Sequence, residues 1–225
     1  MRFSGEKQAS KNEVIVKYKG EDVTTMEKSV LRKEMKRLRR EMTADERKIR
    51  DEKIFENLTN LSRFKDKKWF YIYVSYGTET DTKEIIKYLL SLKDKKDIHI
   101  AVPKVLGTEM EFFEIDSLDE LKKSSMGILE PNNHRLVNVK DVEYFERLDP
   151  AENVVMILPG LAFDIERGRA GYGGGFYDKY LNRYGADEFL KIGICYDFQM
   201  QKYDTIKMEE NDVKVDMTVT DRAYY

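Results

Sequence analysis

The stretch "NVVMILPGLAFDIERGRAGYGGGFYDKYL", residues 153–181, contains a strand, a glycine-rich loop and a helix in succession. Residues 153–158 are almost entirely apolar, as in a strand that is buried on both faces of a sheet. Tyr177, Tyr180 and Leu181 have helical spacing. A buried strand that leads through a loop into a helix is the repeating unit of α/β proteins.

The same alternation continues on both sides of this stretch. Further strands are predicted at residues 68–76, 97–105, 110–116, 189–197 and 212–221. A helix is predicted over 80–95, and a helical turn over 117–123. Repeated strand–helix–strand order predicts an α/β fold with a mostly parallel central sheet and helices on both faces. Ligands bind such sheets at the carboxyl ends of the strands, so we expect a site where the glycine run follows the most apolar strand.

Two helices are predicted ahead of the first of these strands. From Met26 onward, apolar side chains recur at helical spacing, at Leu31, Met35, Leu38 and Met42. Thr43 and Glu46 have the spacing of a capping box. A second helix is therefore expected to begin there and to run through Ile49, Ile54, Phe55 and Leu58.

The first 25 residues differ from the rest of the chain. They are polar apart from an alternating segment at 13–23, which predicts either a small hairpin or a partly disordered extension. No Pro/Gly/Ser-rich stretch divides the remaining residues, so we expect 26–225 to form a single domain.

Composition excludes several classes of protein. The 40 basic residues nearly balance 42 acidic ones, so a nucleic-acid or membrane partner would need a local patch, and only residues 28–40 offer one. The single cysteine, Cys195, rules out a disulfide framework, and with two histidines zinc chemistry is not expected. No apolar run is long enough to span a membrane, and the first residues lack the apolar core of a signal peptide. We expect a cytoplasmic protein.

The glycine run indicates an anion site. Glycines let consecutive backbone N–H groups approach one ligand, and the helix that follows adds free N–H donors and a positive dipole end. Arg169 would supply a fixed charge that matches phosphate oxygens. Asp178 would repel phosphates unless a hard cation lay between them, so it is a candidate magnesium ligand.

Other interpretations of the glycine run fit less well. A mobile surface loop is the simplest alternative, and the flanking arginine, aromatic residues and acid weigh against it. No Gly-Lys-Ser/Thr follows, which rules out a Walker loop, and the late position in the chain argues against a Rossmann fingerprint. A strand of an RNA-recognition domain would be weakened by this many glycines.

The segments "LPGLAFD" (158–164) and "GRAGYGGGFYDKYL" (168–181) resemble the signature of the 5-formyltetrahydrofolate cyclo-ligases, also called methenyltetrahydrofolate synthetases. Further matches run from about Lys28 to the C-terminus. They are "KSVLRKEMKRLR", "ETDTKEII", "AVPKV", "GILEP" and "ENDVKVD". Residues 1–25 have no counterpart.

The resemblance implies a reaction and a fold. The reaction is the ATP- and magnesium-dependent conversion of 5-formyltetrahydrofolate to 5,10-methenyltetrahydrofolate on a three-layer α/β/α domain. ATP would phosphorylate the formyl oxygen to give an imidate phosphate, and N10 of the folate would then displace phosphate from that carbon. The protein's task would be to position two ligands and to neutralise charge on the transferred phosphoryl group.

The resemblance also implies roles for particular residues. It assigns ATP binding to Lys28, Arg32, Arg169, Gly171, Tyr172, Gly173, Gly174, Gly175, Phe176 and Tyr177. It assigns folate binding to Glu79, Tyr172, Gly173, Gly174, Gly175 and Phe176. It assigns magnesium to Asp178 and Asp216, and catalysis to Arg169 and Asp178.

Several of the candidate residues have alternatives at this point. Glu79 could instead cap the helix predicted over 80–95. Tyr76 and Phe112 are candidates to stack on the folate, with core packing as the alternative. Asp216 faces away from Val213, Val215 and Met217 if residues 212–221 form a strand, and it could equally be a solvent-exposed carboxylate at a strand end.

Rival functions remain open. The chain could be a folate- or RNA-binding protein without catalysis that uses the basic helix at 28–40. A sugar-phosphate isomerase or a CoA-transferase would need a catalytic base that the sequence does not offer. We expect the enzyme, acting as a monomer on 5-formyltetrahydrofolate and ATP, with no membrane or nucleic-acid partner.

Overall fold

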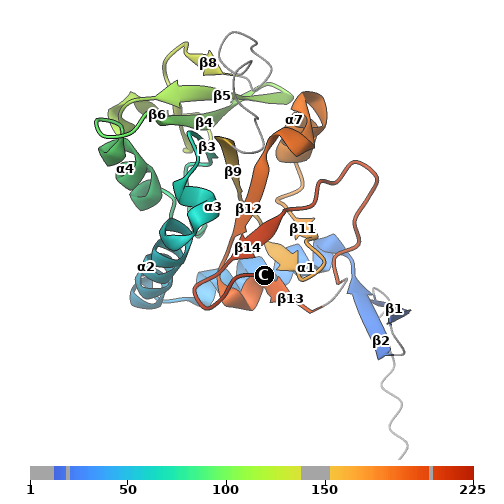
Figure 1. Cartoon of the computed structure of the whole chain (residues 1–225). Coiled ribbons are helices and arrows are strands. Elements are labelled where there is room, and N and C mark those ends of the chain that lie inside the picture. The colour runs from blue at the N-terminus through green and yellow to red at the C-terminus, as the bar shows by residue number, and fades with distance from the viewer. Residues whose placement is uncertain (1–12, 19–20, 138–152, 203–204) are drawn as a thin grey trace, which may run out of the picture.

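The computed structural model describes residues 13–18, 21–137, 153–202 and 205–225. Within them, a seven-stranded sheet has the order β14-β12-β9-β3-β4-β5-β8 (Figure 1). Its strands are β3 (Trp69–Ile72), β4 (His99–Leu106), β5 (Glu109–Ile115), β8 (Leu136–Val137), β9 (Val154–Leu158), β12 (Leu190–Ile194) and β14 (Met217–Val219). The five strands from β14 to β4 pair in parallel, and β5 and β8 pair antiparallel at one edge. The predicted α/β class with a mostly parallel sheet is confirmed.

Helices cover both faces of this sheet and make three layers. On one face lie α2 (Ala44–Asn60), α3 (Ser62–Lys65) and α4 (Lys83–Leu92), and on the other lies α7 (Phe176–Tyr184) (Figure 1). Alternate residues of β3 enter the two cores: Phe70 and Ile72 pack toward α2 and α4, and Trp69 and Tyr71 toward α7. The residues of β9 are all buried, as its apolar run predicted.

The first helix packs on a second, smaller sheet. Helix α1 (Lys28–Glu41) buries Leu31 and Met35 against β10 (Ala162–Asp164) and β11 (Arg169–Ala170). These two strands pair with each other, and β10 also pairs with β13 (Met200–Gln201). The helix therefore lies next to the strands that lead into the glycine run.

The second helix begins as the sequence predicts. The Thr43 hydroxyl accepts a hydrogen bond from the Glu46 N–H, and the Glu46 carboxylate accepts one from the Thr43 N–H, which is the complete capping box. Ile54 and Leu58 are fully buried. Ile49 is 61% exposed, so its place on the helix is correct but it belongs to the solvent face.

Residues ahead of α1 form an antiparallel hairpin of β1 (Glu13–Tyr18) and β2 (Glu21–Met26), which extends away from the other sheets (Figure 1). This matches the hairpin alternative for that segment, whereas residues 1–12 of the extension lie outside the described residues. The division of the chain at residue 25 stays a prediction. In the described parts of the chain, no helix combines the length and apolar character needed to cross a membrane.

Short elements complete the antiparallel edge. The helical turn predicted at 117–123 is a 3-10 turn, η1 (Leu118–Glu120), followed by a hairpin of β6 (Leu121–Lys123) and β7 (Leu129–Pro131). Two further 3-10 turns, η2 (Ala186–Glu188) and η3 (Asp197–Gln199), flank β12.

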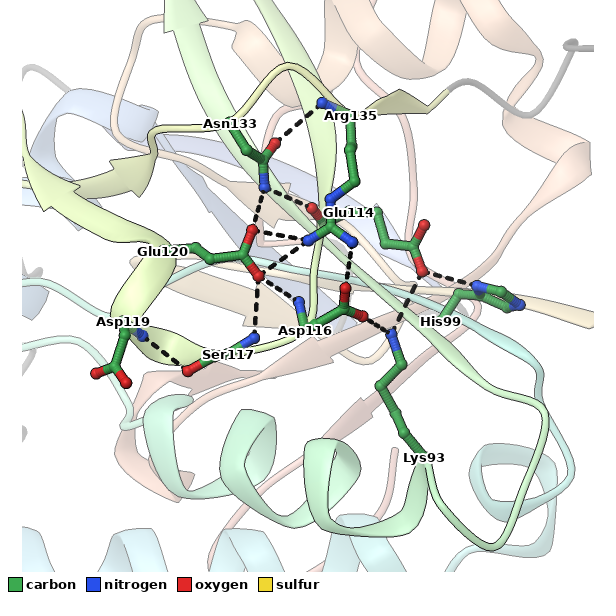
Figure 2. A network of polar contacts seen from close by, with 9 residues as sticks. All are labelled: Lys93, His99, Glu114, Asp116, Ser117, Asp119, Glu120, Asn133 and Arg135. Carbon is green, nitrogen blue, oxygen red and sulfur yellow. Dashed lines mark hydrogen bonds and ion pairs between the residues drawn. The ribbon is translucent and has the colours of Figure 1, made fainter.

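Charged side chains gather at this edge in a cluster that we name the β5 edge network (Figure 2). Its members are Lys93, His99, Glu114, Asp116, Ser117, Asp119, Glu120, Asn133 and Arg135. Both glutamates of the network contact a nitrogen-containing side chain. Glu114 lies 2.8 Å from the His99 ring, and Glu120 lies 2.7 Å from Arg135.

The predicted strand at 212–221 is shorter than expected. Only Met217–Val219 pair with β12, and the residues before them lie outside the sheet. They bond elsewhere: the Val215 N–H donates to the Arg167 carbonyl (3.1 Å) and the Asp216 N–H to the Lys191 carbonyl (2.8 Å). The alternation of apolar residues there is therefore not that of a paired strand, and the orientation inferred from it for Asp216 loses its basis.

Candidate active site

A cavity of roughly 1070 Å³ opens at the carboxyl ends of the parallel strands. Tyr73 and Val74, which directly follow β3, line it together with Pro159, which directly follows β9. The side chains of Pro103 and Val105 on β4 complete this wall. The site thus lies where an α/β sheet is expected to place one.

The glycine run forms one side of the cavity. Gly173 (φ +109°) and Gly175 (φ +66°) adopt backbone conformations that side chains disfavour. Gly175 is also the residue that precedes the first turn of α7, so the free N–H groups of that helix begin at the end of the glycine loop. Glycine geometry and a helix N-terminus in one place suit the binding of a phosphate.

Two basic residues of α1 form the facing side. Arg32 lines the cavity and donates from Nε to the Gly171 carbonyl at 2.7 Å, which ties the helix to the glycine loop. Lys28, one turn earlier, is buried at the cavity wall and pairs with Asp212. Arg32 therefore contacts the glycine loop, and Lys28 lines the same cavity.

Arg169 and Asp178 form a buried ion pair behind the loop. The distance between Arg169 Nη2 and Asp178 Oδ1 is 2.7 Å, and the same carboxylate oxygen accepts from the Val213 N–H at 3.1 Å. Asp178 lies in the first turn of α7, where a carboxylate is favoured by the helix dipole. Its position is therefore fixed by the arginine, the helix and the C-terminal segment together.

Asp212 is a further acid of the cavity lining, whereas the predicted Asp216 does not line the cavity. Asp212 lines the cavity beside Asp178, whose carboxylate is bonded to the adjacent Val213. Burial acts to raise the pKa of Asp212, but the Lys28 ammonium and the Glu209 N–H hold it below its usual range. Asp216 lies outside the cavity lining and accepts from both the backbone and the ammonium of Lys191, at 2.7 and 3.0 Å.

Glu79 reaches the cavity from the loop after β3. Its carboxylate accepts a hydrogen bond from the Tyr76 N–H at 2.8 Å. Burial raises the pKa of Glu79, against the lowering effects of the Tyr76 N–H, the Tyr172 hydroxyl and the Arg39 charge. A half-buried acid with so few charged partners is suited to bind donor groups of a ligand.

The two aromatic candidates for stacking on the folate lie in different environments. Tyr76 lines the cavity, is 52% exposed, and lies against Gly127 of the β6–β7 hairpin. Phe112 is completely buried among Tyr71, Tyr177 and Tyr180, so core packing is the correct interpretation for that residue.

The structure brings the other predicted site residues together around this cavity. The lining includes Lys28, Arg32, Tyr76, Glu79, Arg169, Gly171, Tyr172, Gly173, Gly174, Gly175, Phe176, Tyr177 and Asp178. Besides Asp212, sequence reasoning missed the apolar lip formed by Met126, Ile128 and Leu129 of the β6–β7 hairpin. The segment "GILEP" was a visible signal for this lip, because it belongs to the family resemblance.

The acids at the cavity fit a magnesium ion that is shared with a ligand. No group of three or more His, Cys, Asp or Glu side chains is arranged to hold a metal in the described residues. Mg²⁺ commonly binds through one or two carboxylates together with substrate phosphates and water. Asp178 and Asp212 supply such a pair.

Comparison with known proteins agrees with the resemblance. The model of the 5-formyltetrahydrofolate cyclo-ligase family matches residues 24–221. The mitochondrial 5-formyltetrahydrofolate cyclo-ligase of Arabidopsis thaliana is 29% identical over 86% of this chain and 74% of its own length. The 5-formyltetrahydrofolate cyclo-ligase of Haemophilus influenzae is 27% identical over 85% of this chain and 96% of its own.

Solved structures agree as well. The 5,10-methenyltetrahydrofolate synthetase of Aquifex aeolicus superposes with a TM-score of 0.71 at 30% identity, over 88% of this chain and 91% of that one. The synthetase of Mycoplasma pneumoniae, at 23% identity and a TM-score of 0.62, shares the fold over 87% of this chain and 99% of that one. The family predicted from the glycine segment is confirmed, and the chain belongs to the 5-formyltetrahydrofolate cyclo-ligase family of enzymes.

Proposed function

We propose that this enzyme converts 5-formyltetrahydrofolate to 5,10-methenyltetrahydrofolate, with ATP consumed to ADP and phosphate and with magnesium required. One observation carries the proposal beyond family membership. A single cavity is lined by the cations of α1, the glycine loop at the start of α7, and the half-buried acid Glu79. A nucleotide phosphate and a folate ring therefore have complementary groups within reach of each other.

The chemistry needs this proximity. The formyl oxygen attacks the terminal phosphorus of ATP, so that the P–O bond to ADP breaks and an imidate phosphate forms. N10 of the same folate then attacks the formyl carbon, the C–O bond to phosphate breaks, and N10 gives up its proton. Because the substrate supplies both nucleophiles, the protein's contribution is positioning and charge neutralisation.

The basic and backbone groups act on the phosphates. In the proposal, Arg32 and Lys28 bind the terminal phosphates from one side, and the N–H groups of Gly173 to Gly175 bind them from the other. Lys28 exchanges its present partner, Asp212, for a phosphate. Arg169 keeps Asp178 in place, because its guanidinium is buried and bonded to that carboxylate.

Magnesium would supply further neutralisation of the phosphate charge. We assign its protein ligands to Asp178 and Asp212. Asp216 is not retained, since its carboxylate is bonded to Lys191 and lies outside the cavity lining. Glu79 binds the amide and amino donors of the folate ring, and Tyr76 lies at the mouth where that ring would enter.

An absorbance assay tests the proposal. The methenyl product has a chromophore that the 5-formyl substrate lacks, so its growth with time reports the reaction directly. The full chain is expected to form product with ATP and Mg²⁺ together, and to form none when either is withheld. Product formation without ATP, or no product under complete conditions, would contradict it.

The rival nucleic-acid reading loses support from the basic helix itself. Arg37 pairs with Glu34 and Glu41, Arg39 is buried, and Lys28 pairs with Asp212. Few of these charges remain to contact a phosphate backbone along the helix. The cytoplasmic location and the monomeric state stay predictions.

A further inference from the structure

The side chain of Arg39 lies behind the cavity, between groups that belong to its two sides. Although it is on α1, it is only 2% exposed. Its Nε donates to the Thr78 carbonyl at 2.7 Å, and its Nη1 donates to the Tyr172 hydroxyl at 2.8 Å. Thr78 directly precedes Glu79, and Tyr172 belongs to the glycine loop. One guanidinium therefore holds both the loop of the acid and the loop of the glycines.

No ion pair accounts for this arrangement. Within the described residues, no carboxylate lies within 4.0 Å of the Arg39 guanidinium, and its two acceptors are neutral. A charge that is buried on neutral acceptors lowers folding stability, whereas an apolar residue on this face of α1 would pack without that cost. The geometry thus points to a role in the site.

A second arginine reinforces the same point of attachment. Arg47 donates from Nη1 to the Thr78 carbonyl at 2.9 Å and from Nη2 to the Arg39 carbonyl at 2.7 Å. The carbonyl directly before Glu79 thus receives two guanidinium donors. The residue that follows this carbonyl, Glu79, is the one that lines the cavity.

Tyr172 closes the connection between the two sides. Its hydroxyl accepts from Arg39 and acts to lower the pKa of Glu79, and its ring lies 5.8 Å from the Arg39 guanidinium carbon. Arg39, Tyr172 and Glu79 are therefore one connected unit. A displacement of the glycine loop would move the Tyr172 hydroxyl and so alter what Glu79 can bind.

We propose that Arg39 is a positioning residue that couples the glycine loop to Glu79, so that nucleotide and folate each raise the enzyme's affinity for the other. This inference rests on the proposed function, in which the loop binds ATP and Glu79 binds the folate. Nucleotide binding orders the loop and Tyr172, and through Arg39 and the tyrosine hydroxyl it orders Glu79. By linkage, the effect of folate on the affinity for nucleotide is of the same size.

The test measures coupling in the full chain. Calorimetry gives the dissociation constant for 5-formyltetrahydrofolate with and without a non-hydrolysable ATP analogue and Mg²⁺. For the wild type, the analogue is expected to tighten folate binding by about fivefold or more. In Arg39→Ala, folate binding weakens by about tenfold and the effect of the analogue disappears. Arg39→Lys, which can reach only one acceptor, restores part of the affinity.

Two further variants separate coupling from folding. Arg40→Ala removes a neighbouring exposed arginine and should keep the wild-type coupling. Tyr172→Phe removes only the acceptor hydroxyl, so it tests the same link if Arg39→Ala does not fold. In steady-state assays, KM for both substrates should rise in Arg39→Ala while kcat at saturation changes by less than about threefold.

The outcomes are distinct. Wild-type coupling in folded Arg39→Ala and Tyr172→Phe overturns the inference, as does a variant that is less stable but has unchanged dissociation constants. Independent binding of the two ligands by the wild type also overturns it. If the wild type binds neither ligand, the proposed function itself fails.

Discussion

Two charged regions of this molecule differ in the partners of their charged side chains. In the β5 edge network, Glu120 binds Arg135 and Asn133, and Asp116 binds Lys93 and Arg135 (Figure 2). In the cleft, by contrast, Arg32 is held by a backbone carbonyl and Glu79 by a backbone N–H. The network satisfies its charges with each other. At the cavity, Lys28 and Arg169 are paired with carboxylates, whereas Arg32 and Glu79 are held by backbone groups and face the cavity.

Two glutamates express the difference in their protonation. The His99 ring, together with Lys93, holds the pKa of Glu114 below its usual range despite partial burial. Burial raises the pKa of Glu79, and its hydrogen bonds and the Arg39 charge do not offset this. Paired charge stabilises the fold, while charge kept for a ligand lowers its stability.

The largest expected effect is on kcat/KM, and it is tested by replacing one aspartate with asparagine at the cavity and one in the network. Asp178→Asn keeps an oxygen acceptor for Arg169 and Val213 but removes the charge that faces the phosphates. We expect kcat/KM to fall by about 10³-fold, because charge stabilisation in the transition state is lost. Asp116→Asn, in the network, should change kcat/KM by less than about twofold. Methenyl absorbance measures both, and equal losses would remove the distinction between the regions.

The second comparison concerns the two glutamates. Glu79→Gln should raise KM for 5-formyltetrahydrofolate by about 30-fold, since a charged hydrogen-bond acceptor for the folate is lost. Glu114→Gln should leave KM unchanged, because its carboxylate contacts His99 and Lys93 and does not line the cavity. Initial rates across folate concentrations distinguish the two, and an unchanged KM in Glu79→Gln contradicts its assignment.

The third comparison is between two acids of one segment. Asp212→Asn should raise the Mg²⁺ concentration for half-maximal rate by about tenfold, through loss of a charged ligand. Asp216→Asn should not change it, because Asp216 is bonded to Lys191 away from the cavity. A magnesium titration of the rate decides, and a larger effect of Asp216→Asn would restore the original assignment.

The smallest effect is on stability, and its sign differs between the regions. The pKa of Glu79 is higher in the folded state than in the unfolded chain. Glu79 therefore lowers the free energy of unfolding as the pH rises above its pKa in the unfolded chain. Glu79→Gln should therefore be more stable than the wild type by about 1 kcal/mol at pH 7 and no different at pH 4.

A lowered pKa has the opposite consequence for Glu114. Its contribution is present above the unfolded pKa and is lost as pH falls through the folded value. Glu114→Gln should lose about 1 kcal/mol at pH 7, and the loss should shrink below pH 4.5. Urea unfolding at several pH values measures both variants. If both substitutions changed the free energy of unfolding at pH 7 in the same direction, the contrast between the two regions would be contradicted.

Much of the fold was accessible from local patterns. Helix α1 and the capping box of α2 depend on residue spacing within one or two turns, and both are present as predicted. Strand β9 was identifiable from its unbroken apolar run. The antiparallel pairing of β4 with β5 had a signal in its short connection, because two residues cannot make a parallel crossover.

Errors arose where a pattern has more than one physical cause. Apolar residues alternate at 213, 215 and 217 both in a paired strand and in the extended segment that is actually present. The resemblance assigned magnesium to Asp216, and the alternation supported its exposure, but Asp212, four residues earlier, is the residue that lines the cavity. The role of Arg39 did have a signal, since 31, 35 and 39 fall on one helix face and an arginine there must be buried. The groups that Arg39 contacts, Thr78 and Tyr172, are distant in the sequence and could not be predicted from the helix pattern.

The pairing of Lys28 with Asp212 joins residues that are 184 positions apart. Strand β14 follows Asp212 in the sequence, so the edge of the parallel sheet and this ion pair both depend on the last residues of the chain. A chain that ends before residue 212 lacks both β14 and the partner of Lys28, so we expect its cavity to be incomplete.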